Sequence, residues 1–491
     1  MKTGFTMGDL VLLNVNNVTH DIPYTYAVLR YEPLNNGKFF VSAEIGSWDI
    51  LTEDEFNLLK TGRVHEDPEL FKRLEKKGLI LTSRNMKDIY STIRRKKQNI
   101  FTGPSLHIVA VTLRCNQKCL YCHALSRPED AYEYDMDEDT AKEITKFIFQ
   151  TPAKDIVIEF QGGEPLLNLD AVRTVHDTAV KLAGETKKFV SFALVSNMTL
   201  MDEDIATELF EERHIGLATS LDGPKEVHDK NRPFRKGKGS AYEKATYWIE
   251  YFWDKYRYVV NAMPTITKYT LPYWKELVEE YVKRHQYLLW IRHANYFGYA
   301  KSYWQEIGYT PQEFMEFWTK VTDYIVELNA KGKAKMKEGM STIALKKLFG
   351  SRDPMYTDWM SPCGAITGQL AYDHNGNIYT CDEGRSFEEF RLGNVKEMKM
   401  ADIFNHPLRH VMVSASSLES YPTCEVCAWK PWCGTCPVAA YSQYGTVVPP
   451  MPCFYKCYIH KNTFKYVIER WATSEKHRAV FEEWLTTPSP I

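Results

Sequence analysis

Three cysteines near residue 120 have the spacing of an iron-sulfur site. Cys115, Cys119 and Cys122 form a Cys-x3-Cys-x2-Cys run in the segment RCNQKCLYCHA. Three thiolates can hold three corners of a cubane cluster and leave the fourth iron open to a small molecule. The alternative is a structural zinc site, which usually closes with four ligands. The nearest further ligand is His123, which follows Cys122 too closely to complete a tetrahedron. The spacing therefore favours an open cluster that carries out chemistry.

A second set of cysteines is concentrated toward the C-terminus. None occurs in the 240 residues after Cys122. The eight others are Cys363, Cys381, Cys424, Cys427, Cys433, Cys436, Cys453 and Cys457. Eight thiols make two groups of four, which suits either zinc knuckles or four-iron clusters. Because an iron-sulfur motif lies upstream, we expect clusters here as well.

The first cysteine motif follows a segment that is typical of a buried strand. The apolar run 106–113 delivers the cysteines to a loop. Further strands are expected at 156–160, 189–195, 215–220, 258–263 and 287–291. Enough residues for a helix separate each pair, so the strands should be parallel. Six such units predict an α/β fold, a partial (β/α)6 TIM-like barrel, whose reactive groups collect at the C-terminal strand ends.

Glycine-rich and polar segments follow the second and third expected strands. Gly162 and Gly163 allow the backbone to approach a ligand, and Glu164 supplies an acceptor for an ammonium group. Ser196 and Asn197 offer hydroxyl and amide partners for a ribose. Simple connecting turns are the alternative at both places. Their shared position at strand ends favours one ligand site.

The segment after the fourth expected strand, SLDGPKEVHDKNRPFRKGKGS, begins at Ser220. Asp222 either accepts a proton in the substrate pocket, as a catalytic residue, or braces the turn at Gly223. Arg232 has the planar guanidinium that suits a carboxylate. The segment strongly resembles the fourth-strand region of peptide- and protein-maturing radical S-adenosylmethionine (SAM) enzymes. RCNQKCLYCHA resembles the cluster motif of the same superfamily.

This resemblance implies a cofactor site for SAM. The cysteines of the first motif would hold a 4Fe-4S cluster whose free iron binds the amino and carboxylate groups of SAM. The GGEP loop would bind the methionine amino group, Tyr121 and Ser220 would contact the cofactor, and Arg232 would pair with its carboxylate. An electron from a donor such as ferredoxin or flavodoxin would cleave SAM to a 5'-deoxyadenosyl radical, which abstracts hydrogen from an unactivated carbon.

The C-terminal cysteines resemble a SPASM domain, which houses two auxiliary 4Fe-4S clusters. Gly376 and the phrase RLGNV between the two halves fit that pattern, but two residues instead of three separate the last pair of clustered cysteines. The ligands that the resemblance implies for the first cluster are Cys363, Cys381 and Cys436. Those for the second are Cys424, Cys427, Cys433 and either Cys453 or Cys457. Cys457 either completes the first cluster or leaves it with an open iron, and the sequence leaves both arrangements open.

The first hundred residues are expected to form a small winged-helix-like α+β module. Strands are predicted at 10–15, 24–29 and 39–45. A capping box from Thr52 to Glu55 and a cap at Asp67 predict two short helices. The basic run 94–97 is expected in the following linker, as a solvated helix face. In peptide-modifying radical SAM enzymes such a module grips the leader of a precursor peptide as an added edge strand. The alternative is a structural cap on the barrel.

Length and composition limit the other possibilities. A chain of 491 residues exceeds one core. The expected regions are the module (1–100), the barrel (104–310), a helical linker (311–355), the SPASM domain (356–470) and a tail (471–491). A formal charge of −2 gives no reason to expect nucleic acid or an anionic membrane as partner. Without an apolar run of 18 residues or a signal-like start, we expect a cytoplasmic protein.

The combined features predict a radical SAM/SPASM maturase that oxidatively modifies a ribosomally made peptide or protein, through a cross-link between side chains. The start of the barrel, PSLHIVAVTLRCNQKCLYCHA, is most similar to the His-Xaa-Ser system maturases. One alternative is an anaerobic sulfatase-maturating enzyme, which oxidises Cys or Ser to formylglycine. The non-enzyme alternative is a zinc-stabilised peptide-binding protein.

Overall fold

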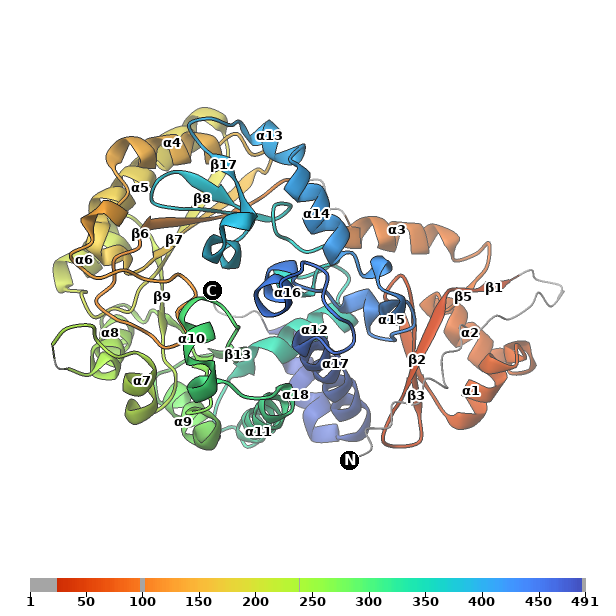
Figure 1. Cartoon of the computed structure of the whole chain (residues 1–491). Helices are drawn as coiled ribbons and strands as arrows, with labels where there is room; N and C mark the ends of the chain where they lie inside the picture. The colour runs from red at the N-terminus through yellow and green to blue at the C-terminus, as the bar shows by residue number, and fades with distance from the viewer. Residues whose placement is uncertain (1–23, 98–101, 238, 488–491) are drawn as a thin grey trace.

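The structure is a computed structural model that describes residues 24–97, 102–237 and 239–487. An α/β core carries an α+β module near the N-terminus and a cysteine-rich region near the C-terminus (Figure 1). The strand predicted at 10–15 lies outside the described residues.

The N-terminal module is built from short strands and three helices. Its strands are β1 (Thr25–Tyr26), β2 (Leu29–Pro33), β3 (Phe39–Ala43), β4 (Trp48–Leu51) and β5 (Ile80–Leu81). Its helices are α1 (Glu53–Lys60), α2 (Pro68–Lys77) and α3 (Met86–Lys97). Strands β2, β3 and β4 form an antiparallel sheet, and β1 pairs with β5. The predicted capping box and the Asp67 cap are both present. The basic run lies in the last turn of α3 instead of a linker.

This module packs on the C-terminal region. The Phe40 ring stacks on Trp429 with 4.4 Å between centroids. Trp48 makes edge contacts with Phe349 and Trp471. Figure 1 shows the module beside α15 and α17, on the side away from the parallel strands. These contacts place the module against helices of the C-terminal half and against Trp429 beside the clustered cysteines.

The parallel strands follow the predicted order. They are β6 (Leu106–Thr112), β7 (Asp155–Gly162), β8 (Phe189–Val195), β9 (Gly216–Ser220) and β10 (Asn261–Met263). Neighbours in this series pair in parallel. The helices between them are α4 (Glu138–Ile148), α5 (Leu169–Thr186), α6 (Glu203–Thr207), α7 (Lys225–Asn231) and α8 (Ala241–Tyr256). The predicted α/β fold of parallel strands is thereby confirmed.

The last barrel strands are fragmented. Beyond β10 lie β11 (Thr265–Ile266), β12 (Leu288–Leu289) and β13 (Arg292–His293), with α9 (Trp274–Lys283) between β11 and β12. The strand expected at 287–291 is shortened to β12, which pairs with β14 (Lys337–Glu338), and β13 follows it and pairs with β11.

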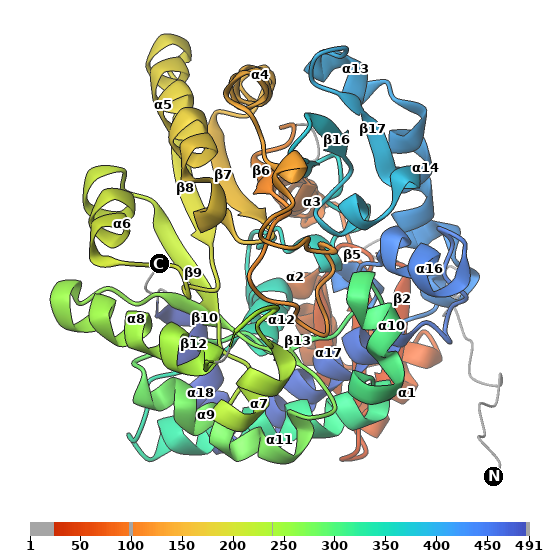
Figure 2. The same cartoon turned by 60° about the vertical axis from the view of Figure 1, so that its left-hand side comes forward.

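The barrel sheet continues into the cysteine-rich region. The strands β15 (Gln369–Tyr372), β16 (Asn377–Tyr379) and β17 (Arg391–Asn394) extend it beyond β6. β15 pairs in parallel with β6, and the next two strands are antiparallel. Figure 2 shows α4 and α5 outside β6 to β8, with β16 and β17 on the other side of β6. The boundary expected near residue 356 is therefore crossed by one continuous sheet.

Helices complete the C-terminal half. They are α10 (Gly298–Ile307), α11 (Pro311–Ala330), α12 (Gly339–Phe349), α13 (Met400–Phe404), α14 (Pro407–Ser416), α15 (Pro422–Glu425), α16 (Pro437–Tyr444), α17 (Tyr455–Thr473) and α18 (Glu475–Thr486). Within the expected tail (471–491), residues 475–486 form α18, in which Phe481 and Trp484 are buried. Among the helices of the described ranges, none has the length and apolar character needed to cross a membrane.

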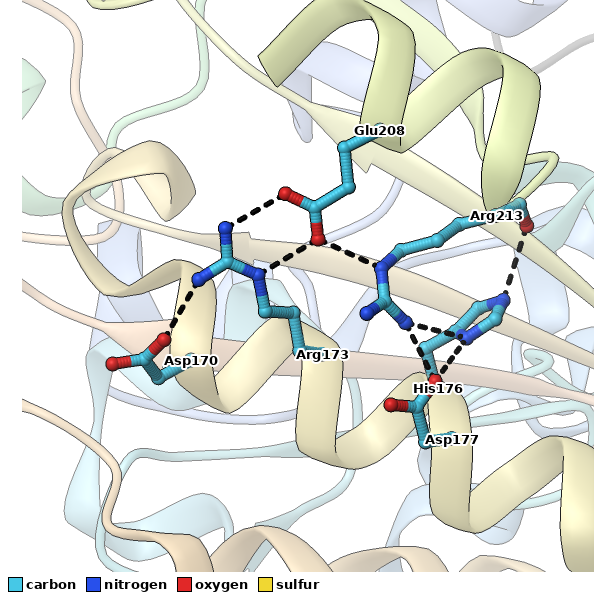
Figure 3. Close-up of polar contacts among 6 residues, drawn as sticks. All are labelled: Asp170, Arg173, His176, Asp177, Glu208 and Arg213. Atoms are coloured by element: carbon cyan, nitrogen blue, oxygen red, sulfur yellow. Dashed lines mark hydrogen bonds and ion pairs between the residues drawn. The ribbon is translucent and has the colours of Figure 1, made fainter. Parts of the chain in front are cut away.

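A charge network fastens α5 to the π-helical turn after α6 on the outside of the barrel (Figure 3). Glu208 accepts hydrogen bonds from Arg173 at 2.7 Å and from Arg213 at 2.9 Å. Arg213 also contacts Asp177 at 2.6 Å. The hydrogen bonds from Arg173 and Arg213 lower the pKa of Glu208 to about 2 against the effect of burial. The pair of guanidinium groups therefore holds this carboxylate ionised.

Candidate active site

The first cysteine motif lies in a loop that directly follows β6. Cys115 and Cys119 are buried, at 6% and 9% exposure. Arg114 anchors the start of the loop by an ion pair with Asp135 at 2.6 Å, and the Gln117 amide donates to the Cys115 sulfur at 3.4 Å. Burial and the neighbouring thiols raise the pKa of Cys115. Burial also raises the pKa of Cys119, to about 11, and a cationic cluster core would hold both of these buried groups as thiolates.

The glycines of the GGEP loop permit close contact with the cluster strand. Gly162 has a φ of +131°, and a Cβ there would lie 2.0 Å from the Thr112 carbonyl oxygen. A Cβ at Gly163 would lie 2.0 Å from the Arg114 carbonyl oxygen. The sequence predicted a close approach to a ligand, and the approach in the structure is to the backbone that carries the cysteines. No side chain fits at either position.

Glu164 joins the ends of β7 and β8. Its carboxylate accepts hydrogen bonds from the Ser196 hydroxyl at 2.7 Å and the Asn197 amide nitrogen at 2.8 Å. Burial raises the pKa of Glu164, and these donors oppose the rise. The Asn197 side-chain amide also lies 3.8 Å from the Cys115 sulfur. The structure thus brings Glu164, Ser196 and Asn197 beside the first cysteine loop. Their roles in binding SAM stay predictions.

Asp222 belongs to a buried network after β9. It accepts hydrogen bonds from the Tyr121 hydroxyl at 2.6 Å and from the Thr265 amide at 3.0 Å. Arg232 donates to the same Tyr121 hydroxyl at 2.6 Å. Burial raises the pKa of Asp222, and the charge of Arg232 opposes this effect. Because Asp222 is fully buried and engaged by donors, its surroundings support the bracing alternative, and its catalytic role stays a prediction. Ser220 ends β9, in register with Met263.

Sequence reasoning missed a contact between the first cysteine loop and the C-terminal region. His123 lies 2.8 Å from Asp382, which also contacts Arg385 at 2.7 Å. Burial alone would raise the pKa of Asp382, but His123 and Arg385 hold it well below the usual range. Ser386 donates to the His123 carbonyl oxygen at 2.8 Å. The position of Asp382 directly after a predicted ligand, Cys381, was the available signal.

Three C-terminal cysteines gather near this contact. Cys363, Cys381 and Cys436 are buried and are electrostatic neighbours of one another. The Ala365 amide donates to the Cys363 sulfur at 3.5 Å, and the Ala439 amide donates to the Cys436 sulfur at 3.4 Å. Such amide donors, the second at the start of α16, stabilise a thiolate. The arrangement suits the first auxiliary cluster.

Four others form a second group: Cys424, Cys427, Cys433 and Cys457. The other three thiols are electrostatic neighbours of the Cys433 thiol, and together with burial they raise its pKa. Cys453 is exposed and has Cys457 as a neighbour. Cys457 therefore lies with the second group and not with the first. Within the described ranges, no three His, Cys, Asp or Glu side chains are close enough to hold a single metal ion, and a four-iron cluster needs its thiolates spread around a cube.

Family models match both cysteine-bearing regions of the chain. The Radical SAM superfamily profile matches residues 109–281, and the SPASM profile, an iron-sulfur cluster-binding domain, matches residues 363–428. The cysteine-type anaerobic sulfatase-maturating enzyme of Clostridium perfringens is 25% identical over 374 residues, which cover 74% of this chain and 96% of that protein.

Two solved structures share the fold. Native anSMEcpe with bound AdoMet gives a TM-score of 0.64 at 20% identity and covers 77% of this chain and 100% of its own. Streptococcus suis SuiB bound to precursor peptide SuiA gives a TM-score of 0.52 at 14% identity, with 87% and 98% covered.

The chain carries a Radical SAM domain and a SPASM domain. It is an enzyme that uses SAM and 4Fe-4S clusters, a maturase related in sequence to the sulfatase-maturating enzymes and in fold to SuiB. The predictions of family, fold and cofactors are confirmed, and the iron-sulfur match replaces the zinc alternatives.

Proposed function

We propose that this enzyme oxidatively modifies a ribosomally synthesised peptide or protein and that its product carries a cross-link between side chains. When bound, SAM and its cluster supply a 5'-deoxyadenosyl radical that takes a hydrogen atom from an unactivated carbon. The observation that carries the proposal is the α+β module, which packs through Phe40 on Trp429 of the SPASM domain and through Trp48 on Phe349 of α12. An enzyme that modifies a peptide needs a second surface that binds a part of the peptide distant from the residue that reacts.

The comparisons support this choice. The match to the Clostridium perfringens enzyme uses 96% of that protein but only 74% of this chain, so about a quarter of the chain has no counterpart there. SuiB, which was solved with the precursor peptide SuiA, covers 87% of this chain. A precursor peptide is accordingly the proposed partner.

The residues of the barrel would position the reactants. Glu164 and Asn197 tie the β7 and β8 ends to the first cysteine loop, and Tyr121 ties that loop to Asp222. Fixed loops hold a bound ligand in one orientation, and the buried Asp222 network leaves little room for water. Arg232 has the charge to pair with a carboxylate of the cofactor.

The leader would bind at an outer strand of the module. In the described residues, β2 and β4 each pair only with β3, so each leaves an edge to which an extended peptide can add. Deleting residues 1–100 is a poor test, because it would uncover Trp429 on the SPASM side. Tyr31→Pro in β2 and Ile50→Pro in β4 each remove one backbone donor. If the leader adds to one of these strands, the variant of that strand should bind the peptide more weakly, while its cleavage of SAM in the absence of peptide should persist. Unchanged peptide binding in both variants would refute edge-strand capture.

The product distinguishes the two candidate reactions. The enzyme would be co-expressed anaerobically with each short open reading frame beside its gene, and the peptides examined by mass spectrometry. A cross-link removes a pair of hydrogens and leaves no aldehyde. Formylglycine is the second candidate product, because the chain is related to sulfatase-maturating enzymes. Its aldehyde reacts with a hydrazide probe. In the purified system, SAM cleavage driven by the chemical reductant dithionite should also proceed with flavodoxin and its reductase as the electron donor. A hydrazide-positive product would overturn the cross-link proposal.

A further inference from the structure

A histidine side chain contacts one cysteine of the second group. The Nδ1 atom of His460 lies 3.7 Å from the Cys433 sulfur, which is within hydrogen-bonding range of a sulfur acceptor. The same atom lies 3.3 Å from the carbonyl oxygen of Gly434. The imidazole is 2% exposed. The contact with the cysteine is therefore made inside the protein, where bulk water does not compete for it.

Helix α17 and the packing around it fix this contact. Cys457 lies in the first turn of α17 and His460 follows it by three residues, so both side chains lie on one face of the helix. The His460 ring meets the ring of Trp359 edge-on, with 5.6 Å between centroids. The Gly434 backbone is packed closely as well, because a Cβ there would lie 2.6 Å from the Met360 carbonyl oxygen. Neither partner of the contact has room to move away.

The surroundings of Nδ1 decide which ring nitrogen of His460 carries the proton. In the free thiol, Cys433 donates to the Gly434 carbonyl oxygen at 3.5 Å. Ligation of iron removes the thiol proton, because the ligand is the thiolate. A thiolate and a carbonyl oxygen both accept hydrogen bonds and donate none. With a cluster in place, the proton is therefore on Nδ1, which donates to both acceptors.

We propose that His460 is a positioning residue that tunes the second auxiliary cluster: its Nδ1–H group donates to the Cys433 thiolate and raises the reduction potential of the cluster. Reduction makes the cluster and its sulfurs more negative, and a hydrogen-bond donor stabilises the more negative state. The ring does this without being an iron ligand. The inference rests on Cys433 as a ligand of the second cluster and is independent of which peptide the enzyme modifies.

A redox titration of the full-length protein tests this role without any peptide. Alanine at the three first-motif cysteines removes the SAM cluster, and the second auxiliary cluster is identified as the electron paramagnetic resonance signal that Cys424→Ala removes. His460→Phe keeps a ring but has no N–H group. In this variant we expect reduction of the second cluster to become about tenfold less favourable, a fall of about 59 mV for a one-electron couple. His460→Gln keeps a side-chain donor and should recover part of this shift.

The matched control is His477→Phe in α18. His477 is also buried, but it contacts Asp323 at 2.9 Å and Ser474 at 2.8 Å and has no printed contact with a cysteine. This variant should leave the potential unchanged. Pulsed electron paramagnetic resonance of protein labelled with 15N-histidine supplies a second readout. The second cluster should show a nitrogen coupling in the parent and in His477→Phe, and the coupling should be lost in His460→Phe.

Three results would overturn the proposal. They are an unchanged potential in His460→Phe, an equal shift in His477→Phe, and a parent protein without the nitrogen coupling. The last of these decides the matter even if His460→Phe fails to retain iron. If Cys424→Ala removed no signal, the ligand group on which the proposal rests would be refuted instead.

Discussion

The contact between the N-terminal module and the SPASM domain depends on Phe40, and its removal has a cost that can be worked out. Phe40 is fully buried; its ring stacks on Trp429 at 4.4 Å and lies 5.9 Å from Trp432. A buried Phe→Ala change costs about 3–5 kcal/mol from lost burial and the cavity left behind. This range includes loss of the aromatic pair, which contributes about 0.5–1.5 kcal/mol. We expect Phe40→Ala to destabilise the docked contact by about 4 kcal/mol.

Hydrogen exchange measured by mass spectrometry resolves this effect by segment. If the loss appears as local opening, about 4 kcal/mol raises amide exchange by up to about a thousandfold. The increase should fall on residues 39–43 and 428–432 and spare the strands β6 to β9. Unchanged exchange at 428–432 would refute the reasoning.

The adjacent residue supplies a matched control. Phe39 points to the other face of β3 and stacks on Phe56 of α1 at 4.1 Å. Phe39→Ala should therefore raise exchange in α1 while 428–432 stay protected. If both variants gave the same exchange pattern, Phe40 would have no special role in docking.

Three further outcomes are expected. Tyr121→Phe removes the hydroxyl shared by Asp222 and Arg232 and should cost about 1–3 kcal/mol; an unchanged thermal midpoint would contradict this. Alanine at all three first-motif cysteines should lower iron by about a third and abolish 5'-deoxyadenosine release; persistent release would disprove the mechanism. The lowered pKa of Glu208, about 2, means that its stabilisation is complete above its ordinary value of 4.5 and is lost as the pH falls toward 2. Glu208→Gln should thus lower the thermal midpoint at pH 6 and differ less from the parent near pH 2; a pH-independent difference would argue against the Arg173 and Arg213 pairs.

Local patterns predicted much of the fold. The apolar run before Cys115 became β6, and the strand expected at 189–195 has those bounds in the structure. The caps at Thr52 and Asp67 lie where the sequence placed them. These features depend on neighbouring residues, so their signal is contained within a few positions of the chain.

Long-range pairing could not be predicted in the same way. Strand β15 joins the barrel by pairing with β6, although the two lie far apart in the sequence. The strand expected at 287–291 is reduced to Leu288–Leu289, which pairs with the distant strand β14. The 2.8 Å contact of His123 with Asp382 arises from the same folding of the C-terminal region onto the barrel. No local spacing encodes such contacts.

The sequence by itself determined the chemistry: the first cysteine run, the GGEP loop and the C-terminal cysteines defined a radical SAM enzyme with a SPASM domain. Only the tertiary structure placed Cys457 with Cys424, Cys427 and Cys433, a choice that the sequence had left open. The physical reason is that ligand type and spacing are local properties of a chain. Which ligands share a cluster depends on packing between distant segments.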